Sequence, residues 1–310
     1  MYRLDKQLFD DITSLRVEGG GEVLWYAQHR KRRKQLTNDG RLVILAADHP
    51  ARMVTGVGSD PVAMGDRADY LGRIVRVLQE GQVDGLMGTP DILEEVIAAQ
   101  LLVSLQSQHL ADVFLADKVL VGCMNRGGLA GTAFEMDDTF TAYTAERMRI
   151  MNLDGAKMMF RLDPLDYGSG RTIEACSQAI NDCLDRDLTV FLEPMMVRYE
   201  EGKYTVDTSA EAMIRICGVA SGLGKSSWKT WLKLPYSVEY PRIVGATTCP
   251  ILMLGGPATG NPQALVDQFA AGMKAGGNVR GALVGRNVLY PGEADPAEVA
   301  RAVSEVVHTS

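Results

Sequence analysis

Thr230-Trp231-Leu232-Lys233-Leu234 is a short apolar run with a lysine at its centre. A run of this length and composition predicts a buried β-strand. Seven further apolar runs occur along the chain, at residues 42–47, 85–87, 119–122, 156–160, 189–192, 251–254 and 282–284. Segments with helical periodicity separate them. Eight strands that alternate with helices are the pattern of a (β/α)8 barrel.

The intervening helices are predicted at residues 61–80, 91–107, 139–151, 172–186, 209–219, 262–275 and 296–307. Several begin with Asp, Ser, Thr or Pro, which suit the first turn of a helix. We therefore predict an α/β protein in which residues 1–310 form a single TIM (β/α)8 barrel domain. Residues 1–40 precede the first strand and are expected to be a helical N-terminal extension that closes the N-terminal end of the barrel, with a break at Gly19-Gly20-Gly21.

An open doubly wound sheet is the alternative architecture. It needs a glycine-rich phosphate loop directly after the first strand, and Leu45-Ala46-Ala47-Asp48-His49-Pro50 contains none. Residues 218–226 end in Gly-Lys-Ser and resemble a nucleotide-binding P-loop. However, five residues instead of four separate Gly218 from Gly224, and a helix precedes them where a P-loop follows a strand. The barrel is favoured, and ATP binding is not expected.

The composition disfavours several classes of protein. A hydrophobic content of 46% supplies a large core, yet no apolar run reaches the roughly 18 residues of a membrane span. The first six residues carry both charges and precede no long apolar stretch, so we expect no secretory signal and a cytoplasmic location. The formal charge of −7 disfavours nucleic-acid binding, and the basic run at residues 29–34 is predicted to be a solvated helix face.

Cysteine and histidine positions indicate neither disulfides nor a metal site. The five cysteines contain no Cys-x-x-Cys pair, and their odd number in a chain of this length argues for reduced thiols. The four histidines, at positions 29, 49, 109 and 308, are too scattered to propose zinc binding. We expect neither a metal nor another cofactor.

Four predicted strands carry charged residues that would share one cavity. Functional groups of a β/α barrel lie at the C-terminal ends of its strands. Asp48 ends the first strand, Lys157 lies in the fourth, Glu193 ends the fifth and Lys233 lies in the sixth. Buried charges need partners, so these two acids and two lysines are predicted to form a mutually neutralising network. Burial also lowers the pKa of a lysine, and a neutral Lys233 could form a Schiff base with a carbonyl.

Each of these residues also has a purely structural explanation when it is taken alone. Asp48 and Glu193 stand next to proline-containing loops, where carboxylates often serve as turn or cap residues. Lys157 could extend its ammonium group to water from a strand end. The joint occurrence of all four favours a functional site.

Glycines follow the last two predicted strands. Gly255 and Gly256 come after the seventh strand, and Gly285 and Arg286 come after the eighth, where β/α barrels often bind phosphate. Glycines allow backbone amides to approach phosphate oxygens, and arginine adds a bidentate cation. Tight turns would use the same glycines, but their place in adjacent loops favours a phosphorylated small-molecule substrate. Loops 126–128 and 167–172 are also glycine-rich and could either close over a ligand or simply begin helices.

These residues together resemble the class I aldolase superfamily of deoxyribose-phosphate, archaeal-type fructose-bisphosphate and tagatose-bisphosphate aldolases. The resemblance extends over about residues 42–290. It implies that Lys233 forms the Schiff base and that Lys157, Glu193 and Asp48 are the accompanying polar groups. In the family the first strand often continues Asp-His-Gly, whereas Pro50 follows His49 here, so a different pocket for the aldehyde is an expectation from the sequence.

The resemblance implies a lyase that cleaves a phosphorylated keto sugar or keto sugar acid into dihydroxyacetone phosphate and an aldehyde. Within the superfamily the chain looks most like a subgroup of bacterial inositol breakdown, which implies 2-deoxy-5-keto-gluconate 6-phosphate as substrate and malonic semialdehyde as the aldehyde. A transaldolase or thiolase-like transferase on the same fold would also keep Lys233, and a non-catalytic sugar-phosphate-binding protein would keep the glycine loops. A homo-oligomer is expected, without nucleic acid or membrane partners.

Overall fold

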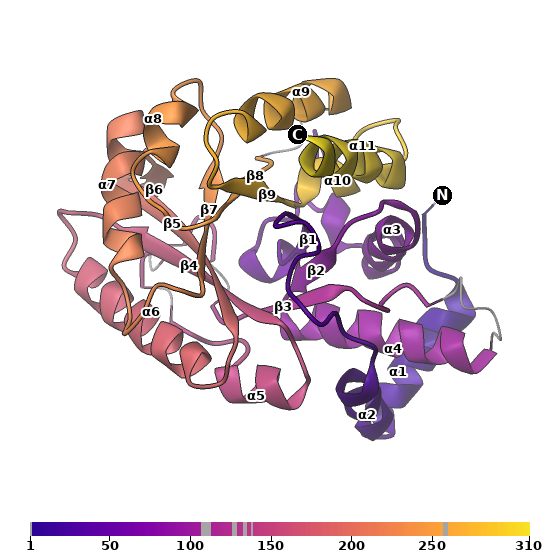
Figure 1. Ribbon diagram of the computed structural model, residues 1–310. Coiled ribbons are helices and arrows are strands. Elements are labelled where there is room, and N and C mark those ends of the chain that lie inside the picture. Colours follow the sequence, from indigo (N-terminus) through magenta and orange to yellow (C-terminus); the bar gives the residue numbers. More distant parts are fainter. Residues whose placement is uncertain (1, 107–112, 126–128, 133–134, 138, 257–259) are drawn as a thin grey trace.

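The computed structural model describes residues 2–106, 113–125, 129–132, 135–137, 139–256 and 260–310. In this part of the chain, eight parallel strands form a closed barrel surrounded by helices (Figure 1). The strands follow one another around the barrel in chain order, and parallel pairing of the fourth with the fifth and of the first with the last closes the cylinder. The predicted TIM (β/α)8 fold is confirmed.

All eight predicted strands are present. They are β1 (Leu42–Ala47), β2 (Gly85–Gly88), β3 (Val119–Cys123), β4 (Gly155–Leu162), β5 (Thr189–Glu200), β7 (Thr230–Pro235), β8 (Ile251–Leu254) and β9 (Val279–Val284). Strand β5 runs beyond its predicted end and pairs antiparallel with β6 (Lys203–Val206) in a hairpin. The sequence analysis missed this hairpin because most of its residues are exposed and polar, so no apolar run marks it.

Two helices, α1 (Lys6–Val17) and α2 (Gly21–His29), precede the barrel. The helices around it are α3 (Arg67–Glu80), α4 (Pro90–Gln106), α5 (Ala145–Ile150), α6 (Gly168–Leu184), α7 (Ala210–Ser221), α8 (Tyr240–Val244), α9 (Pro262–Met273), α10 (Arg286–Leu289) and α11 (Pro296–Thr309). Helices α8 and α10 were not predicted because they are too short to show a helical period. Helix α3 begins later than predicted, where the Asp66 side chain accepts hydrogen bonds from the first-turn amides of Ala68 and Asp69.

Alternating side chains on the barrel strands contribute to two separate cores. Positions 42, 44 and 46 of β1 join an interior cluster that also contains Met87, Val119, Val121, Cys123, Phe191, Leu252 and Leu283. Positions 43, 45 and 47 pack outward in the larger cluster with the helices. Because both faces are buried, β1 reads as one continuous apolar run rather than an alternating one. The same alternation directs position 48 inward.

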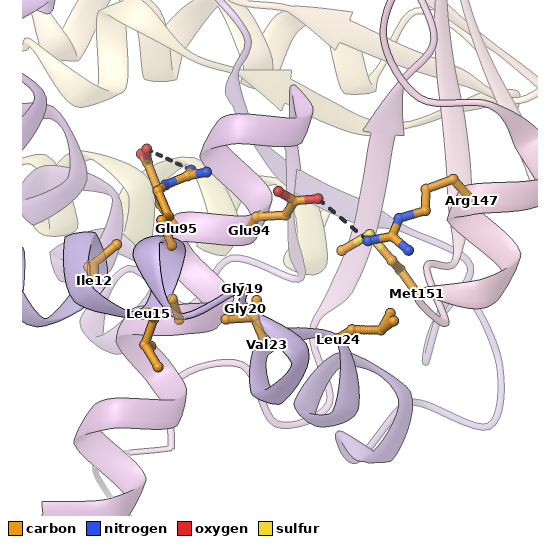
Figure 2. Close-up of a pocket in the computed structure, with 12 residues that line it drawn as sticks. Ile12, Leu15, Gly19, Gly20, Val23, Leu24, Glu94, Glu95, Arg147 and Met151 are labelled. Carbon is orange, nitrogen blue, oxygen red and sulfur yellow. Dashed lines mark hydrogen bonds and ion pairs between the residues drawn. The ribbon is translucent and has the colours of Figure 1, made fainter.

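The N-terminal helices were expected to lie across the N-terminal end of the barrel. Instead they lie against its side. Both α1 and α2 pack on α4 (Figure 1). A cavity of about 200 Å³ remains between them and the barrel, and Figure 2 shows Glu94 and Glu95 of α4 on its wall. Glu95 lies 3.0 Å from the guanidinium of Arg16, and this ion pair ties α1 to α4.

The basic run at residues 29–34 is not a solvated helix face, and this expectation was wrong. After α2 the chain is irregular, and the Arg30 side chain is only 1% exposed. Arg30 lies 2.6 Å from the Asp154 carboxylate, and Arg33 lies 2.7 Å from that of Asp84. Asp84 and Asp154 directly precede β2 and β4, so this segment reaches the N-terminal ends of the strands. Leu36 packs against the interior cluster, and the segment thus closes the barrel.

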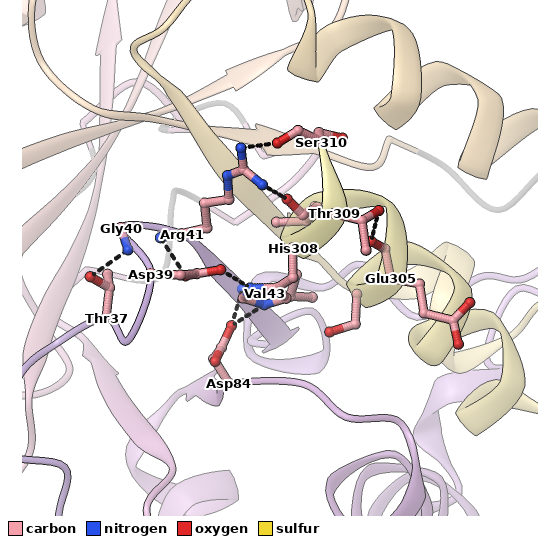
Figure 3. Close-up of polar contacts among 12 residues, drawn as sticks. Thr37, Asp39, Gly40, Arg41, Val43, Asp84, Glu305, His308, Thr309 and Ser310 are labelled. Carbon is pink, nitrogen blue, oxygen red and sulfur yellow. Dashed lines mark hydrogen bonds and ion pairs between the residues drawn. The ribbon is translucent and has the colours of Figure 1, made fainter.

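The last helix reaches the same end of the barrel through His308. Figure 3 shows His308 between two aspartates: its Nδ1 lies 2.7 Å from Asp39 and its Nε2 lies 3.0 Å from Asp84. Asp84 also accepts a hydrogen bond from the Val43 amide of β1. The hydrogen bond to Asp84, together with Asp39, raises the pKa of His308 to about 9 against the effect of partial burial.

Replacing Asp154 by alanine should destabilise the fold by about 3–5 kcal/mol, because it leaves the Arg30 guanidinium buried without its carboxylate. The free energy of unfolding, measured by urea denaturation, checks this. Asp10→Ala is the control, since it breaks only a solvent-exposed pair with Lys6 and should change stability far less. Equal losses in the two variants would contradict the structural role of Arg30.

His308 should make stability depend on pH. Its folded pKa of about 9 lies above the ordinary value of 6.5, so its contribution is complete below pH 6.5 and is lost as the pH rises through about 9. Asp39, Asp84 and Arg33 are the charged groups around it. Urea denaturation across this window should show a steeper loss for the parent protein than for His308→Gln. Parallel plots of unfolding free energy against pH for the two proteins would refute the role given to His308.

Candidate active site

Four charged side chains meet inside the C-terminal half of the barrel. Asp48 follows β1, and Lys157, Glu193 and Lys233 lie on β4, β5 and β7. Their side chains are 2%, 0%, 3% and 8% exposed, in that order. The structure therefore brings together all four charged residues that the sequence analysis selected.

These residues form one continuous chain of ion pairs. Lys157 Nζ lies 3.1 Å from Asp48 Oδ2 and 3.0 Å from Glu193 Oε2. Lys233 Nζ lies 2.9 Å from the same Glu193 Oε2. Two carboxylates and two ammonium groups thus neutralise one another, as buried charges require.

The two lysines occupy different electrostatic environments. Burial lowers the pKa of Lys157, but the adjacent Asp48 and Glu193 carboxylates outweigh this and hold it above the ordinary value. Burial also lowers the pKa of Lys233, and there the Glu193 and Asp48 carboxylates, opposed by the positive Lys157, do not restore it. Lys157 therefore remains a cation, whereas Lys233 loses its proton more readily than an ordinary lysine.

Both carboxylates stay ionised. Burial raises the pKa of Glu193, but Lys157 and Lys233 more than compensate and lower it to about 2. Burial likewise raises the pKa of Asp48, but Lys157 and Arg52 lower it more, so that this pKa is well below its usual range. Asp48 Oδ1 is buried and has no hydrogen-bond partner among the described residues. This oxygen can accept a hydrogen bond from a substrate hydroxyl.

The glycine loops have packing requirements of their own. A Cβ atom at Gly255 would lie 2.4 Å from the Asn287 amide nitrogen, which donates a hydrogen bond to the Gly255 carbonyl. A Cβ at Gly285 would lie 2.4 Å from the His49 ring. Gly256 has φ +69°, in the left-handed region that favours glycine. Phosphate binding by these loops stays a prediction.

Arg286 does not extend over the Gly255 loop. Its Nη1 donates to the carbonyl of Gly56, at 3.4 Å, in the loop after β1. The predicted phosphate residues are therefore divided: Gly255 and Gly256 lie after β8, and the Arg286 guanidinium lies on the β1 side of β9.

A cavity of about 430 Å³ lies near the C-terminal ends of β7 and β8, and none of the four charged residues belongs to its lining. Pro194 and Pro235, which are near neighbours of Glu193 and Lys233 in the chain, line it together with Gly255 and Gly256. Its lining is mostly apolar. It has room for a small ligand beside the first glycine loop.

Sequence analysis did not select Arg52, His49 or Asn287 as site residues. Arg52 ends a short 3-10 helix after β1, which places its Nη1 3.9 Å from Asp48 Oδ2. The sequence signal for this contact was the spacing of four residues between Asp48 and Arg52, which brings two side chains together when the chain turns helically. Of the two glycine-rich loops that could either close over a ligand or begin a helix, 167–172 lies at the start of α6. Loop 126–128 lies outside the described residues.

Within the described ranges, no group of three His, Cys, Asp or Glu residues is arranged to hold a metal ion. The five cysteines are buried, and none of them forms a disulfide. No helix in the same ranges has the length and apolar character needed to cross a membrane.

Comparison with known proteins gives the family. The model of the Cgl0159-like family matches residues 40–307. This chain belongs to the Cgl0159-like family. The crystal structure of Cgl0159 from Corynebacterium glutamicum has 37% sequence identity, a TM-score of 0.90, and coverage of 99% of this chain and 98% of that one. A search of the curated proteins finds no match.

More distant solved structures share the fold of this Cgl0159-like chain. A Schiff base-forming fructose-1,6-bisphosphate aldolase is 20% identical, with a TM-score of 0.61 and coverage of 92% of this chain and 99% of that one. An archaeal fructose-1,6-bisphosphate aldolase, solved with its catalytic lysine bound to a carbinolamine intermediate, is 18% identical, with a TM-score of 0.63 and the same coverage. This chain therefore shares its barrel fold with these two aldolases.

Reductive methylation with formaldehyde should label Lys233 with a midpoint below pH 10.5, because its pKa is lowered from that value. Glu193→Gln should move the midpoint down, since Glu193 raises this pKa, and Lys157→Met should move it up, since Lys157 lowers it. Peptide mass spectrometry across a pH series measures the labelling, with the exposed Lys203 in the same digests as reference for the reagent. Labelling of Lys157 before Lys233 would contradict the electrostatic assignment.

Proposed function

We propose that this protein is a class I aldolase in which Lys233 forms a Schiff base with a phosphorylated keto sugar or keto sugar acid. The observation that carries the proposal is the asymmetric pair of buried lysines around Glu193. A Schiff base requires a neutral amine, and Lys233 is the lysine whose pKa is lowered. A protein that only binds a sugar phosphate has no use for such an amine.

Lys157 is the less suitable nucleophile. It lies between Asp48 and Glu193, at 3.1 and 3.0 Å, and its side chain is fully buried. Both carboxylates favour its charged form, so it would keep the proton that the addition step requires it to lose. Its cation instead lowers the pKa of Lys233 and holds the two carboxylates in place.

The first half of the reaction uses Lys233 and Glu193. The Lys233 amine adds to the substrate ketone, and the carbinolamine then loses water to give a protonated imine. Glu193, at 2.9 Å from Lys233 Nζ, accepts and returns the protons of these steps. The positive imine then attracts electrons from the neighbouring carbon-carbon bond.

The second half uses Asp48. Its Oδ1 accepts the proton of the hydroxyl that is β to the imine carbon, the carbon-carbon bond breaks, and an aldehyde leaves. The electron pair of the broken bond becomes an enamine on Lys233. Protonation of that enamine and hydrolysis of the imine release the ketone product and restore the amine.

The expected ketone product is dihydroxyacetone phosphate. The cavity with Gly255 and Gly256 on its wall, near the C-terminal ends of β7 and β8, offers a place for the phosphate of this product. The two solved structures with this fold are fructose-1,6-bisphosphate aldolases, which act on a phosphorylated keto sugar. The substrate implied by the inositol-breakdown subgroup, 2-deoxy-5-keto-gluconate 6-phosphate, is the first cleavage substrate to assay.

Borohydride reduction in the presence of dihydroxyacetone phosphate should leave a stable adduct on Lys233, found by intact-protein and peptide mass spectrometry. Lys233→Ala should give no adduct and lose cleavage activity by more than the roughly 100- to 10,000-fold typical of losing one acid-base group. Asp48→Asn should still form the adduct while cleavage falls, since Asp48 acts after the imine.

An adduct on Lys157 would overturn the choice of nucleophile. No adduct with this or other phosphorylated ketones would refute the aldolase proposal in favour of a binding protein. An adduct that releases its fragment only when an acceptor aldehyde is added would instead identify a transaldolase.

A further inference from the structure

A second unsatisfied polar atom lies beside the free oxygen of Asp48. His49 follows Asp48 in the chain, and its Nδ1 lies 3.8 Å from Asp48 Oδ1. Both atoms are buried, and neither has a hydrogen-bond partner in the part of the chain that the structure describes. The gap is too long for a direct hydrogen bond, yet it is short enough for one proton-bearing group to contact both atoms.

The end of β9 leaves room for the imidazole ring. A Cβ atom at Gly285 would lie 2.4 Å from His49 Cε1 and 2.9 Å from the Ala46 carbonyl oxygen, so a larger residue would displace the ring or the strand. Gly285 follows β9, which pairs with β1. The sequence analysis assigned this glycine to phosphate binding, and the contact shows that it also places His49 beside Asp48.

The surroundings of His49 keep its imidazole neutral. Burial lowers the pKa of His49 to about 4, against the Asp48 carboxylate, which raises it. The nearby cations Arg52, Lys233 and Arg286 lower it further. The pKa of Asp48 itself lies well below its usual range. His49 therefore holds a proton more firmly than Asp48 does, and it is unprotonated at neutral pH.

Aldol cleavage moves one proton from an oxygen to a carbon atom. Asp48 takes the hydroxyl proton, and the enamine carbon must gain a proton before the ketone is released. Lys157 is a poor donor for this step, because its two carboxylate partners raise its pKa. The hydroxyl carbon is bonded directly to the carbon that becomes the enamine. A group beside Asp48 Oδ1 is therefore also close to the enamine carbon once the aldehyde has left.

We propose that His49 carries this proton from Asp48 to the enamine carbon, an inference that rests on the proposed aldolase function. Asp48 Oδ1 takes the proton as the carbon-carbon bond breaks, and the electron pair of that bond forms the enamine. The proton passes to His49 Nδ1, and the aldehyde leaves. The imidazolium then protonates the enamine carbon, which restores the neutral imidazole and the protonated imine.

The last step can be measured in reverse with dihydroxyacetone phosphate alone. The ketone forms its imine on Lys233, His49 removes a proton from the adjacent hydroxymethyl carbon, and in D2O a deuteron returns. Proton NMR follows the loss of the hydroxymethyl signal, which the parent protein should cause. His49→Gln should slow this exchange about 100-fold or more, while borohydride still traps the adduct on Lys233.

His29→Gln is the matched control, because His29 is exposed at the end of α2 and should not affect the exchange. Gly285→Ala should slow the exchange in the same direction as His49→Gln, since its Cβ displaces the ring. Imidazole added to His49→Ala should restore part of the exchange. A residue that only supports the fold would not be replaced by a free base in this way.

Exchange at the parent rate in His49→Gln would overturn the inference and assign the proton transfer to another group. Loss of both exchange and adduct, without rescue of His49→Ala by imidazole, would also overturn it and give His49 a structural role. Borohydride trapping with the parent protein reports the proposed function separately. No adduct there removes both proposals, while an adduct without deuterium exchange removes only this one.

Discussion

The carboxylate of Glu193 bonds two lysines through one oxygen, and the chemistry of the barrel depends on this shared contact. A lone buried lysine would lose its charge or destabilise the fold, and two buried lysines would repel each other. Glu193 holds both at about hydrogen-bond distance, while Asp48 adds a second carboxylate on the Lys157 side only. Lys157 therefore keeps its proton, and Lys233 loses its proton more readily. Two chemically identical side chains thereby have different roles.

The barrel makes this arrangement possible through strand alternation. Inward positions low in the barrel are filled by apolar side chains such as Ile44 and Phe191, which keep water from the charges above them. On β1 the inward positions are apolar through Ala46, and Asp48 is the first polar one; on β5 Glu193 is the inward position after Phe191. The apolar floor strengthens each ion pair by lowering the local dielectric, and the same floor makes an unpaired charge costly. Fold and site therefore share one constraint.

Much of the fold could be predicted from the sequence because parallel barrel strands are buried on both faces. Apolar runs such as 42–47 and 251–254 mark such strands, and the structure places β1 and β8 at those bounds. The β5–β6 hairpin has no such signal, since its side chains are mainly exposed. The basic run was misinterpreted for a related reason. A run of charged residues, taken alone, suggests exposure to solvent. Only the folded barrel brings Asp154 and Asp84 close enough to pair with Arg30 and Arg33.

The four charged site residues could be predicted because each interrupts or ends an apolar strand. Arg52 and Asn287 were harder to select, since they lie in short helical turns after the strands, whose directions depend on local geometry and on close contacts such as the one between Gly285 and His49. Glycine signals were also ambiguous. Gly255 makes room for Asn287, so the residue that would admit a phosphate is also required by packing.

The N-terminal end of the barrel joins parts of the chain that are far apart in sequence. Asp84 contacts Arg33 and His308, and Ser304 donates a hydrogen bond to the Gln82 carbonyl at 2.8 Å. During synthesis the first strands therefore emerge long before the helix that completes their contacts. A partly made chain has exposed aspartates and open strand edges at this end, and it gains the last of these contacts only when α11 docks. The barrel strands near the start of the sequence thus obtain their last contacts from the helix at its end.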